Sequence, residues 1–223
     1  MKIRIGYGLG TGSTTTDPGR FGALVDNLER LRFDSLWLSE RVNGPALDPV
    51  VGMTFAIART ERLKVGASVM VLPGRNPVLL AKTMASLDRL SNGRVLPAFG
   101  LGIANGAEHQ AFGVERNERA AWFNEAMPLL HRLWSEDSVT HHGERFHLDN
   151  AQVNPKPVQQ PFEVWMGGAA PLELRRVGRF SDGWLPSFST PADVKEGIEI
   201  VNGHATDAGR AIDPEHFGVL VGY

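Results

Sequence analysis

The 223-residue sequence contains no cysteine, which excludes a disulfide framework and thiolate chemistry. It also has no long run of charges of one sign, and its formal net charge is −2. Nucleic-acid-binding surfaces need a basic stripe or patch, so no nucleic-acid partner is predicted. The longest apolar stretch, VVGMTFAIA at 50–58, is much shorter than the roughly 20 residues of a membrane span.

Signals for secretion and for metal binding are also missing. The N-terminal MKIRIGYGLG resembles a strand and has no signal-peptide apolar region, so a cytoplasmic protein is expected. The pattern His141-His142-x4-His147 lacks a fourth ligand, and no metal site is expected from it. A soluble cytoplasmic protein is therefore the default expectation.

A repeated strand–loop–helix order is the main positive signal. Helical periodicity places apolar residues on one face of 18–33 and of 117–134. Strands that alternate with helices at this spacing predict parallel strands and an α/β fold. The strand-like runs lie at 3–9, 35–38, 63–72, 94–99, 162–166, 183–188 and 217–222.

Proline marks the start of each of five predicted helices, because the first helical position needs no amide hydrogen. Four of these prolines follow a residue that caps helices well. The five pairs are Asp17-Pro18, Asp48-Pro49, Asn76-Pro77, Thr190-Pro191 and the weaker Ala170-Pro171. Residues 135–161 show no helical face and are rich in proline and polar residues, which predicts a β-hairpin followed by an extended run. We therefore expect one domain over 1–223 with an insertion at about 135–161.

Two glycine-rich stretches raise the question of a dinucleotide-binding loop. The Rossmann fingerprint is G-x-G-x-x-G opening a helix, with an acidic residue about 20 positions later. The first stretch, Gly8-x-Gly10-x-Gly12, ends before the helix start predicted at Pro18. The second, Gly100-x-Gly102-x-x-x-Gly106, has one residue too many. A nicotinamide dehydrogenase on a doubly wound sheet is therefore the weaker interpretation.

A TIM barrel explains the strand ends better. Chemistry in a (β/α)8 barrel gathers at the carboxyl ends of its strands. Small residues at several of these ends indicate a flat ligand that lies against the backbone. The five ends are Ser39-Glu40-Arg41, Ser68-Val69-Met70, Gly100-Leu101-Gly102, Gly167-Gly168-Ala169 and Pro186-Ser187-Phe188.

Four longer stretches resemble the luciferase-like monooxygenase family, especially its branch that uses the deazaflavin coenzyme F420. They are NPVLLAKTMASLDRLSNGRV (76–95), LLHRLWSEDSVTHHGERF (129–146), NPKPVQQPFEVWMGG (154–168) and RFSDGWLP (179–186). The resemblance implies a TIM barrel, a homodimer, and hydride transfer between F420 and a small organic substrate. An FMN-dependent monooxygenase of the same family and a non-catalytic flavin- or deazaflavin-binding protein stay open as alternatives.

The resemblance also implies roles for the strand ends. Family members back the ring with a bulge in the third strand, often through a non-prolyl cis peptide, and Ser68-Val69 stands there. Gly167, Gly168 and Ala169 would bind the cofactor's phosphate, and a helix start near Pro171 favours an anion independently. Arg175 and Arg176 could assist, or could form a solvated helix face. The other expected cofactor contacts are Ser39, Gly100, Gly102 and, near the tail, Asn105.

Glu40 and Arg41 are the expected catalytic residues, and they depart from the family pattern. Members that exchange hydride through the deazaflavin often carry an acid followed by His here, whereas Arg41 is a poor general base. Arg41 could instead clamp an acidic substrate or stabilise a developing anion. Glu40 could contact the ring or transfer a proton, or merely form a surface ion pair. Ile103 stands where some sugar-phosphate-oxidising members have Glu, which counts against that activity.

Only seven strands are expected, whereas a closed barrel needs eight. The final strand and helix of the family are expected to be missing. A fragment, an unusually short member, or a barrel closed by dimerisation would each explain the count.

Overall fold

The computed structural model describes residues 3–103 and 105–221. Its helices are α1 (Pro18–Arg30), α2 (Pro49–Arg59), α3 (Pro77–Ser91), α4 (Gly106–Phe112), α5 (Arg119–Ser135), α6 (Pro171–Phe180) and α7 (Pro191–Asp207). Its strands are β1 (Gly6–Leu9), β2 (Ser35–Leu38), β3 (Lys64–Ala67), β4 (Met70–Val71), β5 (Val95–Leu96), β6 (Ala98–Gly100), β7 (Val139–His142), β8 (His147–Ala151), β9 (Trp165–Met166) and β10 (Gly183–Trp184). None of the helices in this described part is long and apolar enough to cross a membrane.

The five predicted proline starts are confirmed as the first residues of five helices. The side chains of Asp17, Asp48, Asn76 and Thr190 each accept a hydrogen bond from a backbone amide of the first turn. Ala170, the weaker case, has no capping side chain of its own. Local chemistry at each start therefore explains where these helices begin.

Parallel strands form a curved wall, as the sequence predicts. One sheet has the order β1-β2-β3-β5 and the other the order β10-β9-β6-β4, with every pair parallel. The two sheets are continuous, because β3 leads into β4 through Ser68-Val69 and β5 leads into β6 through Pro97. Phe217 and Leu220 continue the wall through parallel bridges to Trp184 and Ser187.

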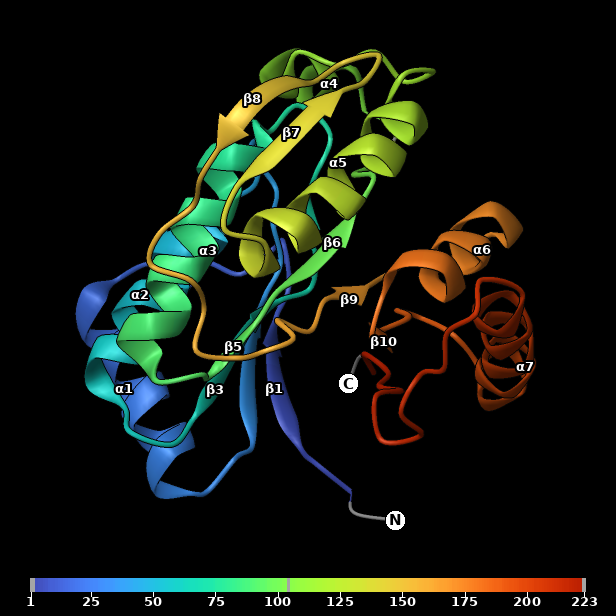
Figure 1. Cartoon of the computed structure of the whole chain (residues 1–223). Helices are drawn as coiled ribbons and strands as arrows, with labels where there is room; N and C mark the ends of the chain where they lie inside the picture. Colours follow the sequence, from blue (N-terminus) through green and yellow to red (C-terminus); the bar gives the residue numbers. More distant parts are fainter. Residues whose placement is uncertain (1–2, 104, 222–223) are drawn as a thin grey trace.

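Helices cover the outside of this wall. Figure 1 shows α1, α2 and α3 beside β1 to β5, and α6 and α7 beside β9 and β10. Among the described residues, β1 pairs only with β2, and no strand joins the 217–220 segment to β1. We call the boundary between β1 and residues 217–221 the seam.

The insertion has the predicted hairpin, formed by the antiparallel strands β7 and β8. Glu125 of α5 holds it, because its carboxylate accepts from the amides of Arg145 and Phe146 and faces His141 Nε2 at 3.0 Å. The extended run that follows contains cis peptides at Asn154-Pro155 and Gln160-Pro161. No cluster of three or more potential metal ligands occurs among residues 3–103 and 105–221.

Buried Asp88 ties the extended run to α3. Its carboxylate accepts hydrogen bonds from the Val158 and Gln159 amides at 2.7 and 3.0 Å, and from Gln159 Nε2 at 2.7 Å. These bonds compensate the cost of burying a charge at a position with 0% exposure. The contacts join two of the stretches that carry the family resemblance.

Two tryptophans fill the inside of the wall. Trp37 of β2 and Trp165 of β9 meet edge to face with ring centroids 6.0 Å apart. Ala98 and Leu185 complete this buried cluster, and the side chains of Val69 and Leu220 pack against it. The cluster forms a solid floor, so any ligand site lies above it.

Candidate functional site

A cavity of about 1000 Å³ opens at the carboxyl ends of the parallel strands and extends along β1 and residues 219–221. The loops after β1, β2, β3, β6, β9 and β10 line it. Nine of the residues singled out in the sequence meet there: Ser39, Glu40, Arg41, Ser68, Val69, Gly100, Gly102, Gly167 and Gly168. Asn105 and Ala169 are not among the described residues that line it.

The bulge between β3 and β4 has the geometry that the family resemblance implies. The Ser68-Val69 peptide bond is cis. Ser39 at the end of β2 donates from its hydroxyl to the Ser68 carbonyl at 3.0 Å, and the two hydroxyl oxygens lie 3.2 Å apart. Two neighbouring strand ends are thus joined by short polar contacts in the cavity wall.

Two glycines beside the bulge leave room for the Val69 side chain. A Cβ added to Gly100 would lie 2.7 Å from Val69 Cγ2, and one added to Gly167 would lie 3.1 Å from Val69 Cγ1. A larger residue at either position would collide with Val69, and the predicted contacts of Gly100 and Gly167 with a cofactor stay a prediction. Gly102 has φ +78°, a left-handed conformation that glycine adopts without strain.

Glu40 is buried, with its side chain only 5% exposed. One carboxylate oxygen accepts from the Val71 amide at 2.6 Å, and the other pairs with Arg75. Arg75 in turn donates to the Val71 carbonyl at 2.8 Å. Burial raises the pKa of Glu40 above its ordinary value, and Arg75 and the Val71 amide oppose that rise. Glu40 thus links the end of β2 to β4, and this is not a surface ion pair.

Arg41 also lines the cavity, and it is half-buried. In the described part of the chain, its guanidinium has neither a hydrogen-bond partner nor an ion-pair partner. The loop that carries it is held by Glu108, a buried residue whose carboxylate accepts from the amides of Val42 and Asn43. The backbone of Arg41 closes a turn by accepting from the Gly44 amide at 3.2 Å.

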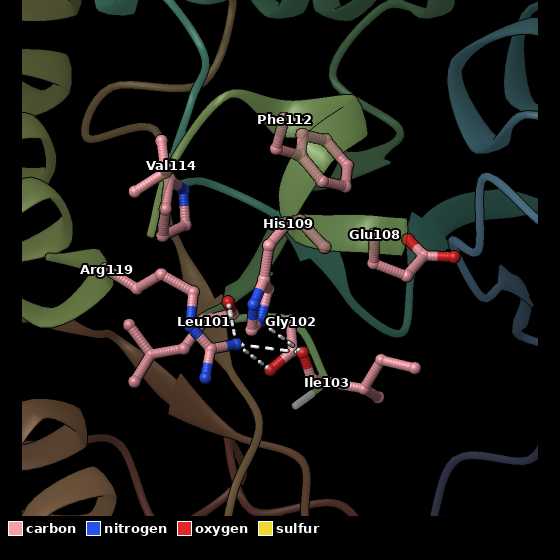
Figure 2. A pocket seen from close by; sticks show the side chains of 10 residues that line it. Leu101, Gly102, Ile103, Glu108, His109, Phe112, Val114 and Arg119 are labelled. Atoms are coloured by element: carbon pink, nitrogen blue, oxygen red, sulfur yellow. Dashed lines mark hydrogen bonds between the residues drawn. The ribbon is translucent and has the colours of Figure 1, made fainter. Parts of the chain in front are cut away.

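The rim after β6 is held by the side chains of Arg119 and His109 (Figure 2). Arg119 Nη1 donates to the carbonyls of Leu101, Gly102 and Ile103 at 3.0, 2.8 and 3.0 Å. His109 Nε2 lies 3.1 Å from the Ile103 carbonyl. Burial lowers the pKa of Arg119 from its ordinary value, although the group stays cationic. These contacts fix the loop that presents Ile103 to the cavity.

Asn105, expected near a cofactor tail, caps α4, and its contact with a cofactor stays a prediction. Its side-chain oxygen accepts from the amides of Ala107 and Glu108 at 3.0 and 3.3 Å. The physical reason is its position immediately before the helix, where free amides need an acceptor.

The start of α6 is already occupied by a side chain of the protein. Glu173 accepts from the amides of Ala169 and Ala170 at 3.1 and 3.0 Å. These are amides that would meet a phosphate according to the resemblance. Arg176 lines the cavity nearby and bonds to Asn124 Oδ1 at 3.1 Å, whereas Arg175 is exposed.

Several residues that line the cavity or hold its wall in place were not found from the sequence. Their contacts are with groups that lie far away in the sequence or at the start of a helix, and no sequence spacing predicts such contacts. These residues are Arg75, Glu108, Arg119 and Glu173. The pattern Asn105-x-x-Glu108 does resemble a capping box, and it could have marked the start of α4. Phe188, at φ +57° and 93% exposed, belongs to the strand end Pro186-Ser187-Phe188 singled out in the sequence, and it does line the cavity.

Comparison with known sequences agrees with this architecture. The model of a family described as luciferase-like monooxygenase matches residues 2–222. An F420-dependent glucose-6-phosphate dehydrogenase of Kineococcus radiotolerans is 32% identical over 82% of this chain and 59% of its own length. A phthiodiolone/phenolphthiodiolone dimycocerosates ketoreductase of Mycobacterium tuberculosis is 32% identical over 70% of this chain and 41% of its own length. The chain thus spans about half the length of these relatives.

Solved structures share the fold. A monooxygenase from Streptomyces bottropensis superposes over 97% of this chain and 70% of its own, with a TM-score of 0.86 and 23% identity. An F420-dependent secondary alcohol dehydrogenase in complex with an F420-acetone adduct covers 98% of this chain and 68% of its own, with a TM-score of 0.83 and 26% identity. An oxygenating constituent of 3,6-diketocamphane monooxygenase from Pseudomonas putida, in complex with FMN, has a TM-score of 0.80, 18% identity and coverage of 98% and 67%.

Proposed function

We propose that this chain, which belongs to the luciferase-like monooxygenase family, carries the cofactor site of an oxidoreductase that transfers a hydride between coenzyme F420 and a small organic substrate. The observation that carries the proposal is the cavity at the strand ends, with its cis Ser68-Val69 bulge. Relatives named as F420-dependent dehydrogenases support the choice of cofactor.

The residues present fit the ring of a deazaflavin. Val69, seated between Gly100 and Gly167, offers an apolar surface at the cavity wall. Ser39 and Ser68 provide hydroxyl groups beside it that suit the polar edge of a ring. When bound, the deazaflavin supplies hydride transfer, a two-electron step without oxygen activation. The protein's part is to position the ring above the floor and to exclude water.

The phosphate-bearing tail of the cofactor fits the cavity less directly than the ring does. Gly167, Gly168 and Ala169 stay our proposed phosphate contacts, but the free amides at the start of α6 already bond Glu173. A phosphate that binds there displaces this carboxylate and then lies on the side of the cavity that Arg176 lines. Asn105 offers less to the cofactor, because its side-chain oxygen already accepts hydrogen bonds from amides of α4.

Glu40 fits a positioning role better than the proton transfer expected from the sequence. Both of its oxygens are engaged, one by the Val71 amide and one by Arg75. It thereby fixes β4 immediately after the bulge, and so sets where Val69 stands in the cavity. The pairing also neutralises its charge beside the ring.

The test is an anaerobic binding titration of the purified protein with F420 and, separately, with FMN, followed by fluorescence. We expect F420 to bind with a dissociation constant below about 100 μM, which corresponds to about 5 kcal/mol or more. Binding of neither cofactor would overturn the proposal.

An FMN-dependent monooxygenase is the second candidate, because one structural neighbour is a monooxygenase described in complex with FMN. Tighter binding of FMN, with oxygen consumption in the presence of a reductant and a ketone or aldehyde, would favour it. Binding without turnover on a panel of alcohols, aldehydes and enones would favour a non-catalytic carrier.

A further inference from the structure

Charged groups on the cavity wall are matched by partners with one exception. Arg4 pairs with Glu215 at 2.6 Å, and Arg176 bonds to Asn124 and to the Leu172 carbonyl. Arg41 is the lining arginine whose guanidinium has no such partner in the described part of the chain. A half-buried cation without a partner in a cavity of this size is a ready receptor for an anion.

In the described part of the chain, the carboxylates that line the cavity form no ion pair with Arg41. Glu40 pairs with Arg75 and the Val71 amide. Glu108 accepts from two backbone amides, and Glu173 accepts from two others. In the described part of the chain, no carboxylate oxygen is within ion-pair distance of the Arg41 guanidinium.

The backbone of Arg41 is held on both sides. Glu40, the preceding residue, is anchored to β4, and the following residues Val42 and Asn43 are anchored to Glu108. Gly44 closes the turn, and a Cβ there would lie 3.2 Å from the Arg41 Cβ and Cδ atoms. Because the loop is fixed before any ligand arrives, little ordering cost remains for the contact.

We propose that Arg41 is the specificity-determining residue of the cavity and that it binds an anionic group, a carboxylate or a phosphate, of the substrate. This inference rests on the proposed function, because it assumes that the ring occupies the neighbouring Val69 surface. Arg41 stands at the end of β2, and Ser39 of the same strand end touches the bulge that bears Val69. A substrate held by Arg41 therefore lies beside the ring. The guanidinium binds the substrate and transfers no proton.

The first experiment uses protein without cofactor and inorganic phosphate as the probe, measured by isothermal titration. Wild type, Arg41→Met, Arg41→Lys and the control Arg20→Met are compared. Arg20 is exposed on α1 and does not line the cavity. We expect Arg41→Met to weaken phosphate binding by about 10- to 100-fold, the effect of one charge-assisted contact, and Arg41→Lys to weaken it less. Equal loss in Arg20→Met, or no loss in Arg41→Met, overturns the proposal.

The second experiment distinguishes the substrate from the cofactor as the source of the anion. F420-loaded protein is titrated with levulinate and with its uncharged methyl ester. We expect wild type to prefer levulinate by about tenfold or more, and Arg41→Met to lose this preference with its F420 affinity unchanged. A large loss of F420 affinity would assign Arg41 to the cofactor's tail, and no preference in wild type would exclude an anionic substrate. If wild type binds no F420, the proposed function fails, and the phosphate titration still tests Arg41 as an anion receptor.

Discussion

At the scale of single residues, the fit of Val69 between two glycines gives a sharp prediction. Gly100→Ala places a methyl group 2.7 Å from Val69 Cγ2. We expect this overpacking to lower the free energy of unfolding by about 1–3 kcal/mol and to weaken cofactor binding. Urea denaturation and the F420 titration measure the two effects.

The control for this prediction lies in the same loop. A Cβ at Gly106, the first residue of α4, meets nothing within 4 Å, so Gly106→Ala leaves stability unchanged or slightly raised. Combining Gly100→Ala with Val69→Ala makes room for the new methyl group and restores part of the lost stability. A Gly100→Ala variant as stable as wild type would mean that Val69 does not occupy this space.

Glu40 gives a prediction about pH. Its pKa in the folded protein is raised by burial above the ordinary value of 4.5, so the folded state binds a proton more tightly than the unfolded state. Its contribution to stability is therefore complete below pH 4.5 and is lost as pH rises through the folded pKa, by at most about 1.4 kcal/mol per pH unit. Glu40→Gln has no such proton, so its stability relative to wild type should improve with rising pH.

The measurement is the free energy of unfolding of both proteins at a series of pH values from 3.5 to 8, roughly the range over which a raised carboxyl titrates. The difference between the two proteins isolates Glu40 from other carboxyls, such as Glu125, whose pKa is lowered. If Glu40→Gln instead loses stability relative to wild type as pH rises, the attraction of Glu40 to Arg75 outweighs the effect of burial on the pKa of Glu40.

At the scale of secondary-structure elements, the start of α6 offers a competition between a side chain and a ligand. Glu173→Ala frees the Ala169 and Ala170 amides. Removing the acceptor costs about 1 kcal/mol of stability. It also raises the affinity for F420 by about two- to fivefold if the phosphate binds at this helix end.

The ribityl deazaflavin that lacks the phosphate is the matched control, because its affinity should not depend on Glu173. Glu173→Gln keeps an acceptor for the amides, so its F420 affinity should lie between those of wild type and Glu173→Ala. Unchanged F420 affinity in Glu173→Ala would place the phosphate elsewhere in the cavity.

Elements whose signals are local could be predicted from the sequence. The capped prolines at Pro18, Pro49, Pro77 and Pro191 depend on one side chain and the first turn, and all four start helices. The site depends on contacts between distant segments, such as Glu108 with the Asn43 amide, which are 65 positions apart. No pattern in either segment specifies that pairing. The cis bulge was expected only because the sequence resembles a family that has one.

At the scale of the whole molecule, the seam has the features of a self-association surface. Exposed apolar side chains flank it: Ile5, Phe188, Val219 and Val221 line the cavity between β1 and the 217–221 segment. Exposed apolar side chains gathered on one face favour association with another chain.

We therefore predict that the protein forms homodimers through the seam. Sedimentation velocity over a hundredfold range of concentration should show a dimer that dissociates on dilution. Ile5→Lys and Val219→Lys place charges at the seam and should shift the equilibrium to monomer by about tenfold or more in dissociation constant, because a buried unpaired charge costs several kcal/mol. Leu90→Lys, at an exposed leucine of α3 that does not line the cavity, should have no effect. A monomer at every concentration, or equal loss of the dimer in all three variants, would contradict association through the seam.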